Sequence, residues 1–152
     1  MSLQEKVMTE LKAAMRAKDS VKLEALRAIK SGILLAQTEN GSKEEISEDA
    51  ELKLLQKLVK QRKDSAAIYT EQNREDLVKP ELEQAAVIEQ FLPTQLSEAE
   101  VEAVVKSIIA NSGAEGMKDM GKVMGMASGE LAGKADGKTI SMIVKRELSN
   151  KQ

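Results

Sequence analysis

The chain is 152 residues long, carries a formal net charge of −2, and is 41% hydrophobic and 32% charged, with neither cysteine nor histidine. This composition is typical of a folded protein with one ordinary core or two small ones, and it excludes disulfides, catalytic thiolates, Ser-His-Asp triads and the usual zinc sites. Tyr69 and Phe91 are the only aromatic residues, which excludes the base-stacking platforms of single-strand binders.

The first two predicted elements form a helical hairpin. Apolar residues recur at three-to-four spacing from Leu3 to Met15 and again from Leu23 to Ile33, as amphipathic helices require. Asp19 or Ser20 is expected to cap the second helix. The dipeptide Asn40-Gly41 is expected to end it in a turn.

A third and a fourth helix follow. Ser47 precedes two acidic residues and is predicted to cap the longest helix of the chain, which runs to about Tyr69. Asn73 is predicted to cap the fourth helix. Pro80 is expected to kink or restart that helix because an interior proline lacks an N–H donor. Pro93 is expected to end it, because the residue before a proline disfavours helical geometry.

The segment "FLPTQLSEAE" contains the clearest local signal in the chain. Ser97 and Glu100 form an S-x-x-E capping box, and Leu96 and Val101 occupy the two positions of a hydrophobic staple. We therefore expect a fifth helix from Ser97 to about Ala110.

These elements predict an all-α fold in two parts. Residues 1–93 are expected to form an N-terminal domain of about four helices, and residues 94–152 a small C-terminal domain of three. Strand patterns are absent, because β-branched residues never alternate with polar ones over a useful length. The apolar runs are too short to cross a membrane and no secretory leader opens the sequence, so we expect a cytoplasmic protein without a membrane partner.

The stretch "MGKVMGMASGELAGKADGKT" places a glycine at every fourth position. Each step of four residues advances about 400° along a helix, so only Gly121, Gly125 and Gly129 can share one face. We predict a sixth helix with a smooth glycine side and Gly133 as its C-cap. Asp136 is predicted to cap a seventh helix.

The glycine side needs an explanation, because each interior glycine costs about 1 kcal/mol relative to alanine. One explanation is close packing against a neighbouring helix of the same domain. The other is a ligand backbone whose phosphates meet Lys122, Lys134 and Lys138, assisted by exposed amides at the start of the seventh helix. Residues 113–152 carry seven basic and five acidic residues, a balance of +2 in an acidic chain, which favours a polyanion partner.

No catalytic residue, metal ligand or cofactor site is predicted. The stretch "GKADGKT" is one residue too short for a phosphate-binding loop, which would need a glycine at Ala132, and no strand precedes it. The paired carboxylates have no local context that would separate their pKa values.

Five short motifs together resemble the YqeY family: "QRKDS", "REDL", "FLPTQLSE", "DMGKVMG" and "GKADG". That family is in turn similar to the helical and tail regions of GatB, the tRNA-binding subunit of the glutamine-dependent aspartyl/glutamyl-tRNA amidotransferase. The resemblance spans essentially the whole chain. It implies an N-terminal helical domain followed by a three-helix tail.

The resemblance also implies a function, a non-catalytic module that interacts with tRNA. Family naming attaches carbon–nitrogen ligase activity with glutamine as amido-N-donor, but the catalytic domain of GatB has no counterpart in this chain. The predicted RNA-binding residues are Lys118, Gly121, Lys122, Gly125, Lys134, Asp136, Gly137 and Lys138. The alternative is an adaptor that docks on an aminoacyl-tRNA synthetase or an amidotransferase subunit.

Overall fold

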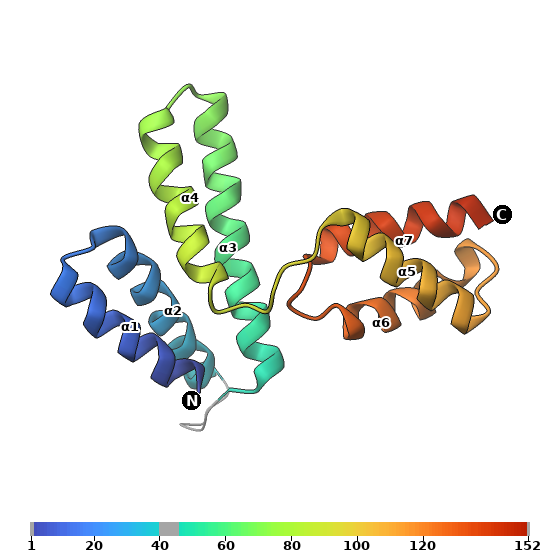
Figure 1. Cartoon of the computed structure of the whole chain (residues 1–152), viewed down its shortest axis with the longest axis horizontal. Helices are drawn as coiled ribbons and strands as arrows, with labels where there is room; N and C mark the ends of the chain where they lie inside the picture. The colour runs from blue at the N-terminus through green and yellow to red at the C-terminus, as the bar shows by residue number, and fades with distance from the viewer. Residues whose placement is uncertain (1, 40–45, 152) are drawn as a thin grey trace. The chain divides into compact units, whose positions relative to one another are not determined.

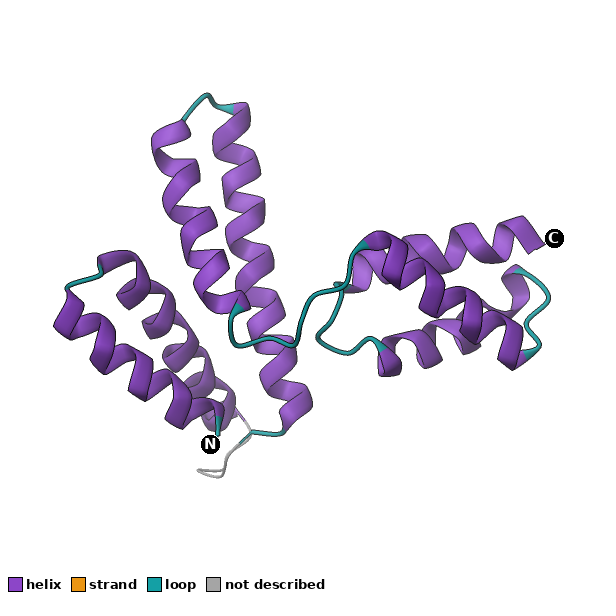
Figure 2. Cartoon of the chain, viewed as in Figure 1, coloured by secondary structure: helices purple, strands orange, loops and turns teal. Residues whose placement is uncertain are grey.

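The computed structural model describes residues 2–39 and 46–151, which form helices joined by short loops and contain no strand (Figures 1 and 2). The all-α prediction is confirmed. The chain divides into two compact units, Met1–Pro93 and Thr94–Gln152, and the division lies where the sequence places the domain boundary. Within the described ranges, no helix is both long and apolar enough to cross a bilayer. The predicted Asn40-Gly41 turn lies outside the described residues.

The first unit begins with a hairpin of α1 (Leu3–Ala17) and α2 (Ser20–Glu39). Lys18 ends α1 in the left-handed conformation, with a φ of 56°. Asp19 is the cap of α2, since its Oδ1 accepts a hydrogen bond from the Lys22 amide at 3.1 Å. The hairpin therefore forms where its sequence predicts it.

The second hairpin consists of α3 (Glu48–Glu71) and α4 (Glu75–Glu89). Ser47 caps α3 as predicted, because its Oγ accepts a hydrogen bond from the Ala50 amide at 3.2 Å. Helix α2 packs against both α3 and α4, which joins the two hairpins around one core. The buried residues of this core are Leu3, Val7, Leu11, Ala14, Ala25, Leu26, Ile29, Ile33, Ile46, Leu55, Val59, Ala85 and Ile88.

Helix α4 differs from its prediction at both ends. Its N-cap is Arg74 and not Asn73, which instead adopts a left-handed φ of 59°. The Arg74 guanidinium donates two hydrogen bonds to the Asp76 carboxylate in the first turn, from Nε to Oδ1 at 3.1 Å and from Nη2 to Oδ2 at 3.0 Å. The helix passes through Pro80 without restarting, and it ends at Glu89, before the expected stop.

Polar side chains brace α3 against its neighbours. The Arg62 guanidinium donates from Nε to Gln84 Oε1 at 3.1 Å, and Gln84 Nε2 donates to Glu24 Oε2 at 2.7 Å. Lys63 Nζ lies 2.7 Å from Glu89 Oε1. The basic residues of the "QRKDS" motif therefore hold helices together.

The second unit consists of α5 (Glu98–Ser112), a single 3₁₀ turn η1 (Met117–Asp119), α6 (Met120–Glu130) and α7 (Gly137–Lys151). Each of its three α-helices packs against the other two. The buried residues of their shared core are Val101, Val105, Ile108, Ile109, Ala114, Val123, Ala127, Leu131, Ala135, Ile140, Ile143, Val144 and Leu148.

The predicted capping box starts α5. Ser97 Oγ accepts a hydrogen bond from the Glu100 amide at 3.2 Å, and Glu100 Oε1 accepts one from the Ser97 amide at 3.1 Å. Leu96 packs against the core that contains Val101, as the staple requires. The helix ends where Gly113 takes a left-handed φ of 74°.

Candidate nucleic-acid interface

The glycine face of α6 is the surface formed by Gly121, Gly125 and Gly129. Val123 and Ala127 of the same helix are buried, and at about 100° per residue the three glycines lie on the opposite side. All three are exposed. Apart from the backbone of α6 itself and the chain neighbours, no described heavy atom lies within 4 Å of the position a Cβ would take at any of them. Packing against a neighbouring helix of the same unit is therefore the wrong explanation for these glycines.

Side chains stand only along the edges of this face. Helical spacing places Lys122 and Met126 on one edge and Ser128 on the other. The Lys122 ammonium donates to the carbonyl oxygen of Ser112 at the end of α5, at 3.2 Å. Met126 is 44% exposed. The arrangement offers bare helix backbone beside one cation and one flexible apolar side chain.

The turn between α6 and α7 is tied to the start of the unit. Gln95 Nε2 donates to the Gly133 carbonyl at 2.6 Å, and the Leu96 amide donates to the Lys134 carbonyl at 2.9 Å. The C-cap of α6 is Leu131, so the prediction of Gly133 as C-cap is wrong. Gly133 lies in the turn beyond it, where the reversal of the chain requires a φ of 75°. No periodic pattern predicts these long-range contacts of Gln95 and Leu96.

Asp136 caps α7 as predicted, because its Oδ1 accepts a hydrogen bond from the Thr139 amide at 2.7 Å. Gly137 and Lys138 lie exposed in the first turn. The amides at this helix start were expected to be open to phosphate. The Thr139 amide is already engaged, so the expectation does not hold for that donor.

The predicted residues fall into two groups at opposite ends of the second unit. The first group is Lys118, Gly121 and Lys122, and the second is Lys134, Asp136, Gly137 and Lys138. Ser149 Oγ lies 3.6 Å from Met117 Sδ, so α6 starts beside the end of α7. From Lys122 to the last residue of α6, Glu130, the helix rises about 12 Å at 1.5 Å per residue, and the second group lies beyond that end. The structure does not gather them into one cluster, and Gly125 lies between the groups.

Lys118 has a partner in its own loop. Its Nζ lies 3.3 Å from Glu115 Oε2, and both side chains are more than two-thirds exposed, at 72% and 77%. Exposed pairs of this kind contribute at most about 1 kcal/mol. The pairing therefore leaves Lys118 able to exchange Glu115 for another anion.

In the second unit, the titratable groups with shifted pKa values take part in helix capping and in ion pairs between helices. Hydrogen bonds from the Ser97 amide and hydroxyl lower the pKa of Glu100. The hydrogen bond and charge of Lys106 lower the pKa of Glu102, and the charge of Arg146 lowers it further. Glu102 lies 3.0 Å from Lys106 Nζ and 3.4 Å from Arg146 Nη2. These shifts arise from a helix cap and from an ion-pair network between α5 and α7.

Comparison with known proteins gives one family and several relatives. The family described as "Yqey-like protein" matches residues 4–148. The curated relatives named "Altered inheritance of mitochondria protein 41, mitochondrial" include one from Lachancea thermotolerans, 37% identical over 103 residues, 66% of this chain and 54% of the relative. Those from Meyerozyma guilliermondii and Kluyveromyces lactis are 39% identical over 83 residues and 33% identical over 105 residues. The matches cover 55% and 67% of this chain, and 42% and 56% of those relatives. The chain spans about half the length of the curated relatives it matches.

Proposed function

Because this chain belongs to the YqeY-like protein family, we propose that it is a non-catalytic module whose second unit holds tRNA through the sugar-phosphate backbone. The observation that carries the proposal is the open glycine face of α6. The RNA class is suggested by the resemblance to the tRNA-holding tail of GatB. Formation of a carbon–nitrogen bond is not expected of this chain alone, and the purified protein should release neither phosphate from ATP nor ammonia from glutamine.

The glycine face suits a nucleic-acid backbone for two physical reasons. Because no side chain stands at Gly121, Gly125 or Gly129, a sugar-phosphate strand can approach the backbone of α6 closely. The lysines at both ends of the helix then supply cations for phosphates, which position a nucleic acid without reading its sequence. Gly125 in the interior of α6 (Met120–Glu130) weakens the helix by about 1 kcal/mol relative to alanine, while Gly121 and Gly129 lie in its terminal turns. No described contact within the unit offsets the cost of these glycines. A ligand that needs the bare backbone would account for them.

The test is the salt dependence of tRNA binding. Replacement of Lys122, Lys134 and Lys138 together with glutamine should weaken binding to labelled total tRNA in fluorescence anisotropy. The slope of log K against log salt should fall by about 0.9 or less for each phosphate that a lysine no longer neutralises, fewer than three units in total. All three side chains are exposed, so the fold should be unchanged.

The control is an equal change of charge in the first unit. Lys12, Lys53 and Lys57 are exposed there, and their joint replacement with glutamine should leave the salt slope close to that of the parent. The proposal is wrong if the parent chain does not bind tRNA, or if the two triple variants bind tRNA equally well.

An adaptor that docks on a synthetase or amidotransferase subunit is the second candidate. It is favoured by Met126, which is exposed beside the glycine face, because methionine adapts to varied protein surfaces. A pull-down with and without ribonuclease separates the candidates, since a protein partner survives the nuclease. The compartment is also a proposal: the sequence favours the cytoplasm, whereas the names of the relatives describe mitochondrial proteins. Microscopy of the tagged chain decides it.

A further inference from the structure

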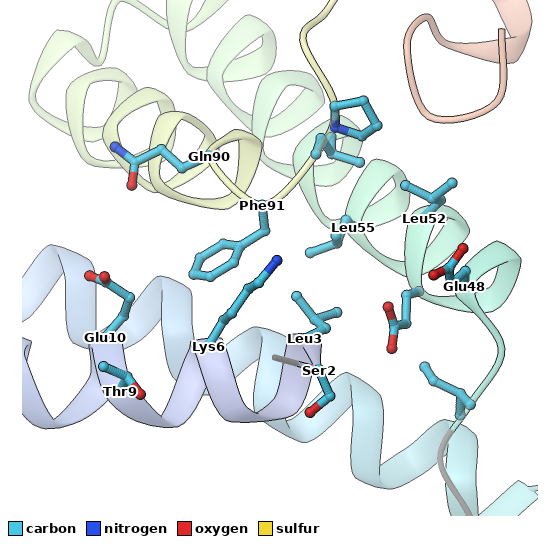
Figure 3. A pocket seen from close by; sticks show the side chains of 14 residues that line it. Ser2, Leu3, Lys6, Thr9, Glu10, Glu48, Leu52, Leu55, Gln90 and Phe91 are labelled. Carbon is cyan, nitrogen blue, oxygen red and sulfur yellow. The ribbon is translucent and has the colours of Figure 1, made fainter.

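The first unit contains a cleft that the proposed function does not use (Figure 3). It lies between the N-terminal turns of α1, the N-terminal turns of α3 and the segment 90–93 after α4. Its volume is about 860 Å³, within the usual size range of ligand sites. Every described residue that lines it belongs to the first unit.

The walls of the cleft present apolar surface. Leu3 and Leu55 are buried at its base, and the Phe91 ring projects from the end of α4 toward α1 (Figure 3). Leu52 also lines the cleft and, unlike Phe91 and Leu54, does not pack against the described part of the core. The apolar surface of Leu52 therefore faces the cleft without contributing to that core.

Charged side chains stand around this apolar surface. Lys6 extends from α1 into the cleft (Figure 3). Glu48 and Glu51 line the side formed by α3, and Glu10 lines the side formed by α1, where it pairs with Lys22 at 3.7 Å. Three carboxylates against one ammonium give the lining a net negative charge.

We propose that this cleft binds an apolar, basic peptide segment of a partner protein. Apolar side chains of the peptide would cover Leu52 and Phe91, and a lysine or arginine would pair with Glu48. The Lys6 ammonium would donate to carbonyl oxygens of the peptide backbone. A nucleic acid does not fit, because its phosphates would meet the rim carboxylates. The docking site is therefore separate from the glycine face and does not depend on it.

Selection from a library of short random peptides displayed on phage, against the immobilised full chain, tests the proposal. The enriched peptides should combine apolar anchors with a net positive charge. In fluorescence anisotropy with synthetic copies, Leu52→Gln should weaken binding at least about tenfold, the size of effect typical of a buried anchor. Glu48→Gln should weaken it several-fold, and the difference from the parent should shrink at high salt.

Leu82→Gln is the matched control. Leu82 lies on α4 outside the cleft and is 46% exposed, so the same chemical change there should leave peptide affinity unchanged. Thermal melts establish that all three variants are folded, and tRNA binding by Leu52→Gln should equal that of the parent. The proposal is overturned if no basic apolar peptide is enriched, or if the enriched peptides bind Leu52→Gln as tightly as Leu82→Gln.

Discussion

Gly125 lowers the stability of α6 because glycine is a poor helix former, and no close packing within the second unit compensates for this loss. Close packing against a neighbouring helix, the first explanation given for the glycine side, would make any side chain at this position destabilising. The structure contradicts that reasoning, because a Cβ at Gly125 would meet nothing within 4 Å. A glycine in open helix surface can be replaced without a clash.

Gly125→Ala should therefore stabilise the protein while it weakens tRNA binding. Alanine is the better helix former, so the free energy of unfolding should rise by about 0.5–1 kcal/mol. The added methyl group would hold an approaching strand further from the backbone. Urea unfolding measures the stability, and fluorescence anisotropy with labelled tRNA measures the affinity. If the variant gains stability and binds tRNA as tightly as the parent, the glycine face is not part of the binding surface.

Gly32 lies in α2 at a close-packed position, so the change from glycine to alanine should have a different effect there than at Gly125. A Cβ at Gly32 would lie 2.6 Å from Leu54 Cδ1, so Gly32→Ala must displace a side chain that packs against the core. We expect this variant to be no more stable than the parent in the same urea experiment.

The Glu102 carboxylate makes part of the stability depend on pH. Lys106 and Arg146 hold the pKa of Glu102 below its ordinary value of 4.5. The unfolded chain therefore binds a proton at a higher pH than the folded chain, and the stability from this group is present above about pH 4.5 and is lost as pH falls through the lowered folded pKa. Thermal melts from pH 6 to pH 3 should show a smaller pH-dependent loss for Glu102→Gln than for the parent. Identical pH profiles would contradict this role.

Some residue roles were predictable because they depend on a few neighbours in sequence. The capping roles of Ser97 and Asp136 follow from such local patterns, and both are confirmed. The bond from Lys122 to the Ser112 carbonyl depends on how α5 and α6 pack. No spacing in the sequence reports that packing.

Helix α4 shows at the scale of an element how packing overrides local preference. Pro80 removes one backbone donor, yet the helix continues through it. Contacts of α4 with α3 hold the part of the helix that follows the proline, since Arg62 bonds to Gln84 and Lys63 pairs with Glu89. Of the two outcomes expected at Pro80, a kink or a restart, the restart does not occur, because local preference considers the isolated segment alone.

Pro80→Ala should consequently stabilise the first unit. Alanine restores the missing donor, and an interior proline costs up to about 3 kcal/mol relative to alanine. The urea midpoint should rise while the dependence of unfolding free energy on urea stays the same. A lower midpoint would mean that the half-buried proline ring contributes more through packing than its missing N–H costs.

Element positions were more predictable than their ends and their surroundings. The caps assigned to Asn73 and Gly133 were each displaced by one or two residues, the usual uncertainty at helix ends. Periodicity also identified which glycines share a face of α6. It could not tell what covers that face, because the arrangement of neighbouring helices is a tertiary property.

At the scale of the whole molecule, the two units have separate cores. We expect the fragment 94–152 to fold by itself, with marginal stability because so small a core buries little surface. Circular dichroism should show a helical spectrum and a cooperative melt for the fragment. A disordered fragment beside a cooperative full chain would mean that the second unit needs the first in order to fold.

The shortage of side chains on α6 has a consequence for motion. Helix α6 buries only Val123 and Ala127, whereas α5 buries four of its residues, and glycines leave its backbone hydrogen bonds open to water. Segments with few buried contacts open locally at the lowest free energy. In hydrogen–deuterium exchange, the amides of α6 should therefore exchange faster than those of α5 and α7. Bound tRNA should slow exchange most in α6. The exchange rate of this one helix would then measure both its local opening in the free protein and the binding of tRNA.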